Sequence, residues 1–227
     1  MKGKLYGVGV GPGDPELITL KALRVIEKTG IIAAPDSGSE RNAALEIAAK
    51  AVDFSEKELL KLYMPMTTDS RALNVSHDAA AQTLINKLNA GNDVAFLTLG
   101  DPTIYSTYMY IHDRVADAGY ETHIAEGIPS FCAAAARLNI PLCEGRQALH
   151  IIPAAYDSED YMRMSGTKVL MKPGKAFPRI REQLESGALH GKAMMVERCG
   201  MDGERVYHDL AEIEEEMSYF SIIIIKE

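Results

Sequence analysis

The segment Asp93–Thr107, DVAFLTLGDPTIYST, reads as a buried strand followed by the start of a helix. Its first half is an almost uninterrupted apolar run, which is typical of a strand covered on both faces in a parallel sheet. Gly100, Asp101 and Pro102 then end the strand, and three serine or threonine residues and a tyrosine follow. A turn needs only one or two of these groups. The excess polar chemistry therefore indicates a binding loop, at the strand end where open α/β sheets bind ligands.

The rest of the chain repeats this alternation of strand and helix. We expect strands at 4–10, 30–35, 59–65, 93–100, 121–127, 148–154, 167–174, 192–200 and 219–227, and helices at 14–30, 39–52, 71–91, 103–119, 129–139 and 177–187. Such alternation predicts an α/β architecture with mainly parallel sheets. We expect two α/β domains, 1–115 and 116–227.

Composition sets limits on function. The 227 residues are 47% hydrophobic and 25% charged, which is ordinary for a globular protein, and the net charge of -8 argues against a nucleic-acid partner. Glycines interrupt the N-terminus too early for a signal peptide, and no apolar run approaches membrane-spanning length. The three cysteines form neither a disulfide framework nor a metal motif, so we expect a reducing, cytoplasmic setting without a membrane partner.

A glycine-rich loop, YGVGVGPGD at 6–14, follows the first expected strand. Its glycines do not fit Gly-x-Gly-x-x-Gly, because the third position is Asp14 in one register and Pro12 in the other. Asp14 at a helix N-terminus would also compete with a pyrophosphate. The loop suits close backbone contact with a ligand that brings no phosphate, although a tight turn alone would also account for the glycines.

The order of several motifs resembles the tetrapyrrole methylase family of S-adenosylmethionine-dependent methyltransferases. These motifs are GVGVGPGDPELITLKALRVI at 7–26, LTLGDPTIYST at 97–107, EGIPSFCAAAARLNIPL at 126–142 and VLMK at 169–172. Within the family, GDPTIYST, ALHIIPA, ERCG and YFSIIIIK are most similar to the branch that methylates carbon 20 of precorrin-2 or cobalt-factor II in cobalamin biosynthesis.

The resemblance implies two α/β domains with S-adenosylmethionine between them, a tetrapyrrole substrate and a homodimer. It also carries cofactor-binding roles to positions of this sequence. These positions are Pro12, Gly100, Asp101, Ile104, Pro129, Ser130, Met171, Cys199 and Ser221.

Residues for the remaining chemistry are less defined. A base would assist loss of the proton from carbon 20 after methylation, and Asp36, Tyr105 and His150 are the candidates, each of which also has an ordinary structural explanation. The six histidines lack metal-binding spacing, so we expect no protein-bound metal, and any cobalt would arrive inside the substrate. The substrate's carboxylates require local cations in an acidic protein. The candidates are Arg41, Lys172, Lys175 and Arg198.

Three alternatives stay open. The first is a methyltransferase of the same fold that acts on another precorrin position, on ribosomal RNA ribose or on diphthamide. The second is a nicotinamide-dependent oxidoreductase, against which the missing third glycine argues. The third is a cofactor-binding protein without activity, which measured turnover would exclude.

Overall fold

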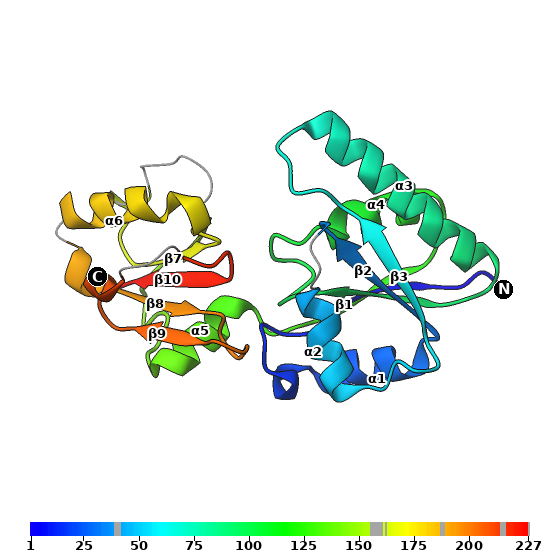
Figure 1. The fold of residues 1–227 in the computed structure, drawn as a ribbon, viewed down its shortest axis with the longest axis horizontal. Helices are drawn as coiled ribbons and strands as arrows, with labels where there is room; N and C mark the ends of the chain where they lie inside the picture. Colours follow the sequence, from blue (N-terminus) through cyan, green and yellow to red (C-terminus); the bar gives the residue numbers. More distant parts are fainter. Residues whose placement is uncertain (39–41, 155–160, 162, 187–188, 214–216, 227) are drawn as a thin grey trace. The chain divides into compact units, whose positions relative to one another are not determined.

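The computed structural model describes the chain except for residues 39–41, 155–160, 162, 187–188, 214–216 and 227 (Figure 1). It divides into two compact units, Met1–Pro129 and Ser130–Glu227. The division comes later than the one after residue 115 that the sequence suggested. The reason is that the segment after 115 supplies an edge strand of the first unit, which pairs with the first strand of the chain.

The first unit is a five-stranded parallel sheet in the order β3-β2-β4-β1-β5. Its strands are β1 (Leu5–Gly9), β2 (Ile31–Asp36), β3 (Glu58–Tyr63), β4 (Val94–Thr98) and β5 (Thr122–Ala125). Its helices are the short 3-10 helix η1 (Pro15–Leu17), α1 (Leu20–Lys28), α2 (Ala43–Ala51), α3 (Ser70–Asn89) and α4 (Tyr108–Asp117).

Helices cover both faces of this sheet, as the apolar run of β4 predicted. In Figure 1, α3 and α4 lie on one face and α1 and α2 on the other. Phe96 packs with Leu84 of α3 and Ile111 of α4 in a fully buried cluster. Because every strand is parallel, the carboxyl ends of all five meet at one edge of the sheet, and the loops that leave this edge are adjacent.

Among the helix starts that differ from the expected ones, two lie at the carboxyl edge of the first sheet. Asp14 caps only η1, by accepting a hydrogen bond from the Glu16 amide, and α1 begins later, with Thr19 as its cap. The segment 99–107 is not helical, and α4 begins at Tyr108. Both changes lengthen the loops at the carboxyl edge of the sheet.

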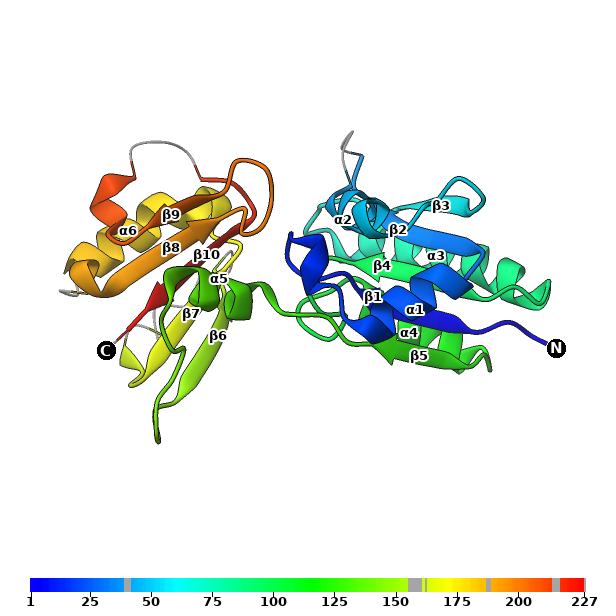
Figure 2. The ribbon, with the colours of Figure 1, turned by 90° about the horizontal axis from the view of Figure 1, so that it is seen from below.

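The second unit is a five-stranded mixed sheet in the order β6-β7-β10-β8-β9. Its strands are β6 (Leu149–Pro153), β7 (Thr167–Met171), β8 (Ala193–Glu197), β9 (Arg205–Tyr207) and β10 (Ser221–Ile225). Its helices are α5 (Ser130–Leu138), η3 (Gly174–Ala176), α6 (Phe177–Ser186), η4 (His190–Lys192) and η5 (Leu210–Glu212). The α5 helix lies on one face and α6 on the other (Figure 2).

The expectation of a mainly parallel sheet was wrong for this second unit. Only β6 and β7 run parallel among its described pairs, whereas β7–β10, β10–β8 and β8–β9 are antiparallel. The loop 198–204 between β8 and β9 is too short for a parallel crossover, which needs a dozen or more residues. The three-residue β9 was not anticipated at all. No helix in the described part of the chain is long and apolar enough to span a membrane.

Candidate cofactor and substrate site

Three glycines bring three loops together at the carboxyl edge of the first unit. Gly9 ends β1, Gly100 follows β4, and Gly127 follows β5. A Cβ added to Gly127 would lie 2.0 Å from the Gly100 carbonyl oxygen and 2.8 Å from the Gly9 Cα atom. A Cβ on Gly9 would lie 2.6 Å from the same carbonyl oxygen. We call these residues the glycine junction, and no other residue type allows its three backbones to approach so closely.

A pair of backbone hydrogen bonds extends this junction to the first loop. Gly100 donates its amide to the Gly11 carbonyl at 2.8 Å, and Gly11 donates to the Gly100 carbonyl at 3.3 Å. Both residues have positive φ, 75° at Gly11 and 73° at Gly100, a conformation that glycine adopts without strain. The glycine-rich loop is therefore held against the Gly-Asp-Pro loop, and Pro12 is buried beside it.

The Asp101 carboxylate ties the Gly-Asp-Pro loop to the loop after β5. Its Oδ1 accepts from the Thr103 amide at 2.8 Å and from the Thr103 hydroxyl at 2.5 Å, and its Oδ2 accepts from the Gly127 amide at 2.9 Å. Asp101 is only 8% exposed. A carboxylate has about four acceptor positions, so one remains for a ligand after these three bonds. The first role of this side chain is to hold two loops in register.

The chain beyond Asp101 is anchored at its far end. The Ser106 hydroxyl lies 2.8 Å from the Thr98 hydroxyl and accepts from the Tyr108 amide at 3.1 Å. Tyr105 lies between these anchors, 48% exposed and with a left-handed φ of 47°. Ile104, half-buried, donates its amide to the Asp101 carbonyl.

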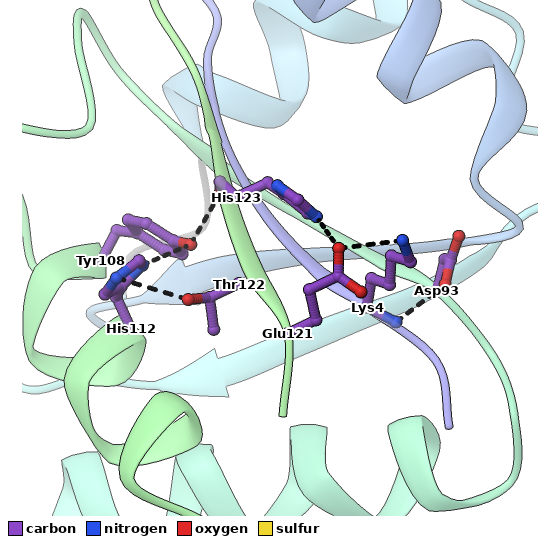
Figure 3. A network of polar contacts seen from close by, with 7 residues as sticks. All are labelled: Lys4, Asp93, Tyr108, His112, Glu121, Thr122 and His123. Carbon is purple, nitrogen blue, oxygen red and sulfur yellow. Dashed lines mark hydrogen bonds and ion pairs between the residues drawn. The ribbon is translucent and has the colours of Figure 1, made fainter. Parts of the chain in front are cut away.

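Tyr108 fixes the start of α4 from inside the unit. Its ring occupies the space in which a Gly7 side chain would lie, since a Cβ there would be 2.1 Å from the ring. Its hydroxyl donates to the His123 carbonyl at 3.1 Å and lies 3.2 Å from His112 Nδ1 (Figure 3). Burial raises the pKa of the Tyr108 hydroxyl, so it stays protonated and remains a donor.

The charge of these loops fits a cationic, phosphate-free ligand. The segments 9–14, 98–107 and 125–130 contain three carboxylates, Asp14, Asp101 and Glu126, and no lysine or arginine. The Glu126 pKa is lowered, mainly because Lys21 of α1 donates a hydrogen bond to its carboxylate. S-adenosylmethionine carries a sulfonium and an amine but no phosphate, so this donor and acceptor set suits it. A pyrophosphate would meet no cation in these segments.

The remaining predicted residues of the first unit differ in how close they lie to the carboxyl edge of its sheet. Asp36 ends β2 at the same carboxyl edge, and its Oδ1 accepts from the Gly38 amide at 2.9 Å, as a turn-forming aspartate does. Pro129 ends the first unit, and Ser130 begins α5; both are half-buried. Arg41 lies outside the described residues.

The predicted residues of the second unit gather at one edge of its sheet. Met171 ends β7 beside Ile222 of β10, and Cys199 lies two residues after the end of β8. Ser221 begins β10, but it is 1% exposed and its hydroxyl donates to the Ser218 carbonyl at 2.8 Å. Only its backbone is therefore suited to contact a cofactor.

Two further candidates do not join this edge. His150 lies near the other end of the β6–β7 pair, opposite Lys168, and its Nε2 is 2.9 Å from the Ser165 carbonyl oxygen. Its candidacy as a base is therefore not supported by the geometry. Lys175 lies in η3, and its side chain is outside the described part of the chain. In the described residues, no three His, Cys, Asp or Glu side chains group as metal ligands.

Some residues that form the site were not recognised from the sequence. Gly9 lies in the glycine-rich loop and Gly127 in the motif at 126–142, but a single sequence does not show that two glycines more than a hundred residues apart are in contact. Thr103 was overlooked as the partner of Asp101, although an Asp followed two residues later by Thr is a common side-chain turn.

The chain is similar to known proteins over most of its length. The model of the Tetrapyrrole (Corrin/Porphyrin) Methylases family matches residues 4–214. The chain is 30% identical to a cobalt-precorrin-2 C(20)-methyltransferase of Salmonella typhimurium over 99% of this chain and 97% of that protein. It is 32% identical to a precorrin-2 C(20)-methyltransferase of a Sinorhizobium species, over 98% and 95% respectively.

Longer relatives and solved structures also match. The cobalamin biosynthesis protein CobIJ of Mycobacterium bovis is 33% identical over 99% of this chain, which spans only 46% of that protein's length. The chain thus spans about half the length of the first of the curated relatives it matches. A uroporphyrin-III C-methyl transferase from Thermus thermophilus, solved with S-adenyl homocysteine, superposes with a TM-score of 0.73 at 20% identity, covering 99% of this chain and 98% of that one. That likeness shows a shared fold, and the family match over nearly the whole length shows that the chain belongs to the tetrapyrrole (corrin/porphyrin) methylases.

Proposed function

We propose that this chain transfers a methyl group from S-adenosylmethionine to carbon 20 of precorrin-2 or cobalt-factor II in cobalamin biosynthesis. The observation that carries the proposal is the full-length similarity to two C(20)-methyltransferases, in a chain whose Gly-Asp-Pro loop contains the Asp101 carboxylate and no lysine or arginine. One of these relatives is named for a cobalt-containing substrate and the other is not, so both substrates are offered in the test.

The residues proposed to hold the cofactor are those that the family resemblance implies. The proposed set remains Pro12, Gly100, Asp101, Ile104, Pro129, Ser130, Met171, Cys199 and Ser221. S-adenosylmethionine supplies an electrophilic methyl group on its sulfonium. The glycine junction and the Asp101 bridge supply alignment, since both keep the loops in one arrangement before any ligand arrives. For an in-line displacement with an activated donor, alignment provides much of the rate enhancement.

Removal of the proton from carbon 20 requires a base, and no residue is assigned to this role. Asp36 and Tyr105 both lie in segments at the carboxyl edge of the first unit, and they remain the candidates. We expect the reaction to involve no protein-bound metal. We also propose a homodimer in the cytoplasm, which light scattering and cell fractionation would test.

The test is direct. Calorimetry should show binding of S-adenosylhomocysteine and none of NAD, and label from methyl-tritiated S-adenosylmethionine should pass to precorrin-2 or cobalt-factor II. Binding of S-adenosylhomocysteine without transfer to either would leave the cofactor site and reject the substrate. Binding of NAD alone would reject both.

A further inference from the structure

Four described residues other than glycine have a left-handed backbone. They are Tyr105, Asn139, Lys172 and Arg198, with φ of 47°, 56°, 57° and 52°. Asn139 has a local reason, because it directly follows α5 and the amides of Asn139 and Ile140 close the last turn. Asn also tolerates this conformation better than other residues. Lysine and arginine tolerate it less well, so the conformation at Lys172 and Arg198 costs folding free energy.

Lys172 and Arg198 leave the second sheet on either side of the chain that enters β10. Met171 pairs with Ile222 on one side of β10, and Glu197 pairs with Ser221 on the other. The Arg198 amide donates to the Phe220 carbonyl at 2.7 Å. Two strand spacings therefore separate the two residues, which puts their Cα atoms roughly 10 Å apart. A residue that breaks the strand conformation can re-aim its side chain away from the alternating pattern of the sheet.

The surface between them is aromatic and exposed. Tyr219 and Phe220 are 44% and 37% exposed, and their rings meet edge to face with centroids 5.5 Å apart. The Lys172 Nζ lies 5.6 Å from the centre of the Tyr219 ring. The Lys172 ammonium thus lies beside one of two solvent-exposed rings, and the backbone of Arg198 pairs with the residue that carries the other.

The charge of Arg198 is not neutralised by the described protein. Its Nε is buried without a hydrogen-bond partner, and no described acid forms an ion pair with the guanidinium. The adjacent Glu197 is used elsewhere, because its Oε1 accepts from the Ser218 amide at 2.7 Å. Because no described acid compensates this charge, an anion that pairs with the guanidinium would be stabilised by it.

We propose that Lys172 and Arg198 bind two carboxylates of the tetrapyrrole substrate while the Tyr219–Phe220 rings pack against the macrocycle. This inference rests on the proposed function and deepens it by naming how the substrate's acetate and propionate side chains are recognised. Arginine pairs with a carboxylate through two parallel hydrogen bonds, and lysine acts as a point charge. In a chain of net charge -8, such a local pair is what lets a polyanion bind.

The test uses uroporphyrin III, a tetrapyrrole with eight carboxylates, in a fluorescence titration of the full chain. Lys172→Gly and Arg198→Gly should each weaken binding roughly tenfold, and the double variant roughly a hundredfold. Neither substitution should lower the thermal midpoint, because glycine relieves the left-handed strain. Binding of S-adenosylhomocysteine should not change. The charge-preserving Lys172→Arg should retain most of the affinity, and Arg198→Lys, which keeps the charge but loses the two parallel hydrogen bonds, should weaken binding less than Arg198→Gly does.

Asn139→Gly is the matched control, since it makes the same change at a left-handed residue outside the pair. It should leave the affinity for uroporphyrin III unchanged. Glycine variants of the pair that bind this porphyrin like the wild type overturn the proposal, and so does a loss of binding that the charge-preserving variants share.

Two further outcomes separate this inference from the proposed function. If porphyrin binding depends on the charges of Lys172 and Arg198 but no methyl transfer to precorrin-2 or cobalt-factor II occurs, the proposed function is rejected and the role of the two residues in binding carboxylates is retained. Methyl transfer whose KM for the tetrapyrrole is unchanged in Lys172→Gly and Arg198→Gly rejects the pair and keeps the function.

Discussion

The glycine junction of the first unit and the edge of the second sheet that carries Lys172 and Arg198, here the Lys172–Arg198 edge, depend on different parts of the chain. The junction is made of backbone, where the absence of side chains at Gly9, Gly100 and Gly127 lets three loops touch. The edge is made of side chains, on positions where glycine would be the easier residue. Substitutions at the junction should therefore damage folding and cofactor binding together. Substitutions of Lys172 and Arg198 should spare folding and affect the substrate alone.

The largest expected effect comes from Gly127→Ala. The new Cβ would lie 2.0 Å from the Gly100 carbonyl oxygen, so backbone must move, and we expect a loss of about 3 kcal/mol of unfolding free energy. Binding of S-adenosylhomocysteine should fall in parallel. Urea unfolding and calorimetry measure the two effects. Gly30→Ala is the control, because nothing lies within 4 Å of its added Cβ, and its stability should change little. If the two variants had the same unfolding free energy and the same affinity for S-adenosylhomocysteine, the glycine junction would not be needed for folding or for cofactor binding.

The next effect is that of Asp101→Asn, which keeps the shape but places an NH₂ group where one acceptor was. An amide on Thr103 or Gly127 then loses its partner, at a cost of about 2 kcal/mol. We expect S-adenosylhomocysteine to bind roughly tenfold more weakly because the two loops separate. Asp14→Asn is the matched change, since Asn still caps the Glu16 amide, and it should be nearly silent. An unaltered affinity in Asp101→Asn would show that the bridge does not position the cofactor.

A smaller effect is expected for Ser221→Ala in the second unit. Removing the buried bond to the Ser218 carbonyl should cost about 1 kcal/mol. The affinity for S-adenosylhomocysteine should stay within about twofold, because the hydroxyl faces the protein rather than a ligand. A large loss of affinity with unchanged stability would instead assign the hydroxyl itself to the cofactor.

The smallest effect is at the amino end of the first sheet, where Lys4 and His123 both bond the Glu121 carboxylate (Figure 3). The Glu121 pKa is lowered, first by the hydrogen bond from Lys4 and then by that from His123. A lowered folded-state pKa gives stability that is present above the unfolded value, about 4.3, and is lost as pH falls through the folded value.

The urea midpoint should therefore drop slightly more below pH 4 in the wild type than in Glu121→Gln. Binding of S-adenosylhomocysteine at pH 7 should be equal in both. A change in that affinity would mean that the Lys4–Glu121–His123 network influences the loops of the glycine junction. Cofactor binding would then not depend on the junction alone.

The first unit was largely predictable from sequence because its signals are local. The apolar run of β4, the Gly-Asp-Pro turn and the glycine-rich loop each act over a few residues. The structure confirms the strand and the turn at this point, but the helix begins later than predicted, at Tyr108. The boundary between the units was less accessible. It depends on β5 pairing with β1, and the pairing of segments more than a hundred residues apart leaves no local pattern.

In the second unit, the strands could be predicted from the sequence but their arrangement in the sheet could not. Its strands were found, but their directions were not, because apolar runs such as SIIII look alike in parallel and antiparallel sheets. Lys172 and Arg198 were candidates only as cations in loops. Their left-handed backbone and their place beside Tyr219 and Phe220 depend on which strands are neighbours, and that is a property of the whole sheet.

The central claim is the position that is methylated. The most direct measurement is a reaction with S-adenosylmethionine carrying a carbon-13 methyl group, offered separately with precorrin-2 and cobalt-factor II, with the product examined by NMR. The account predicts one new labelled methyl, bonded to carbon 20, from at least one of these substrates. A labelled methyl on any other carbon would contradict it, as would no labelled product from a protein that binds S-adenosylhomocysteine.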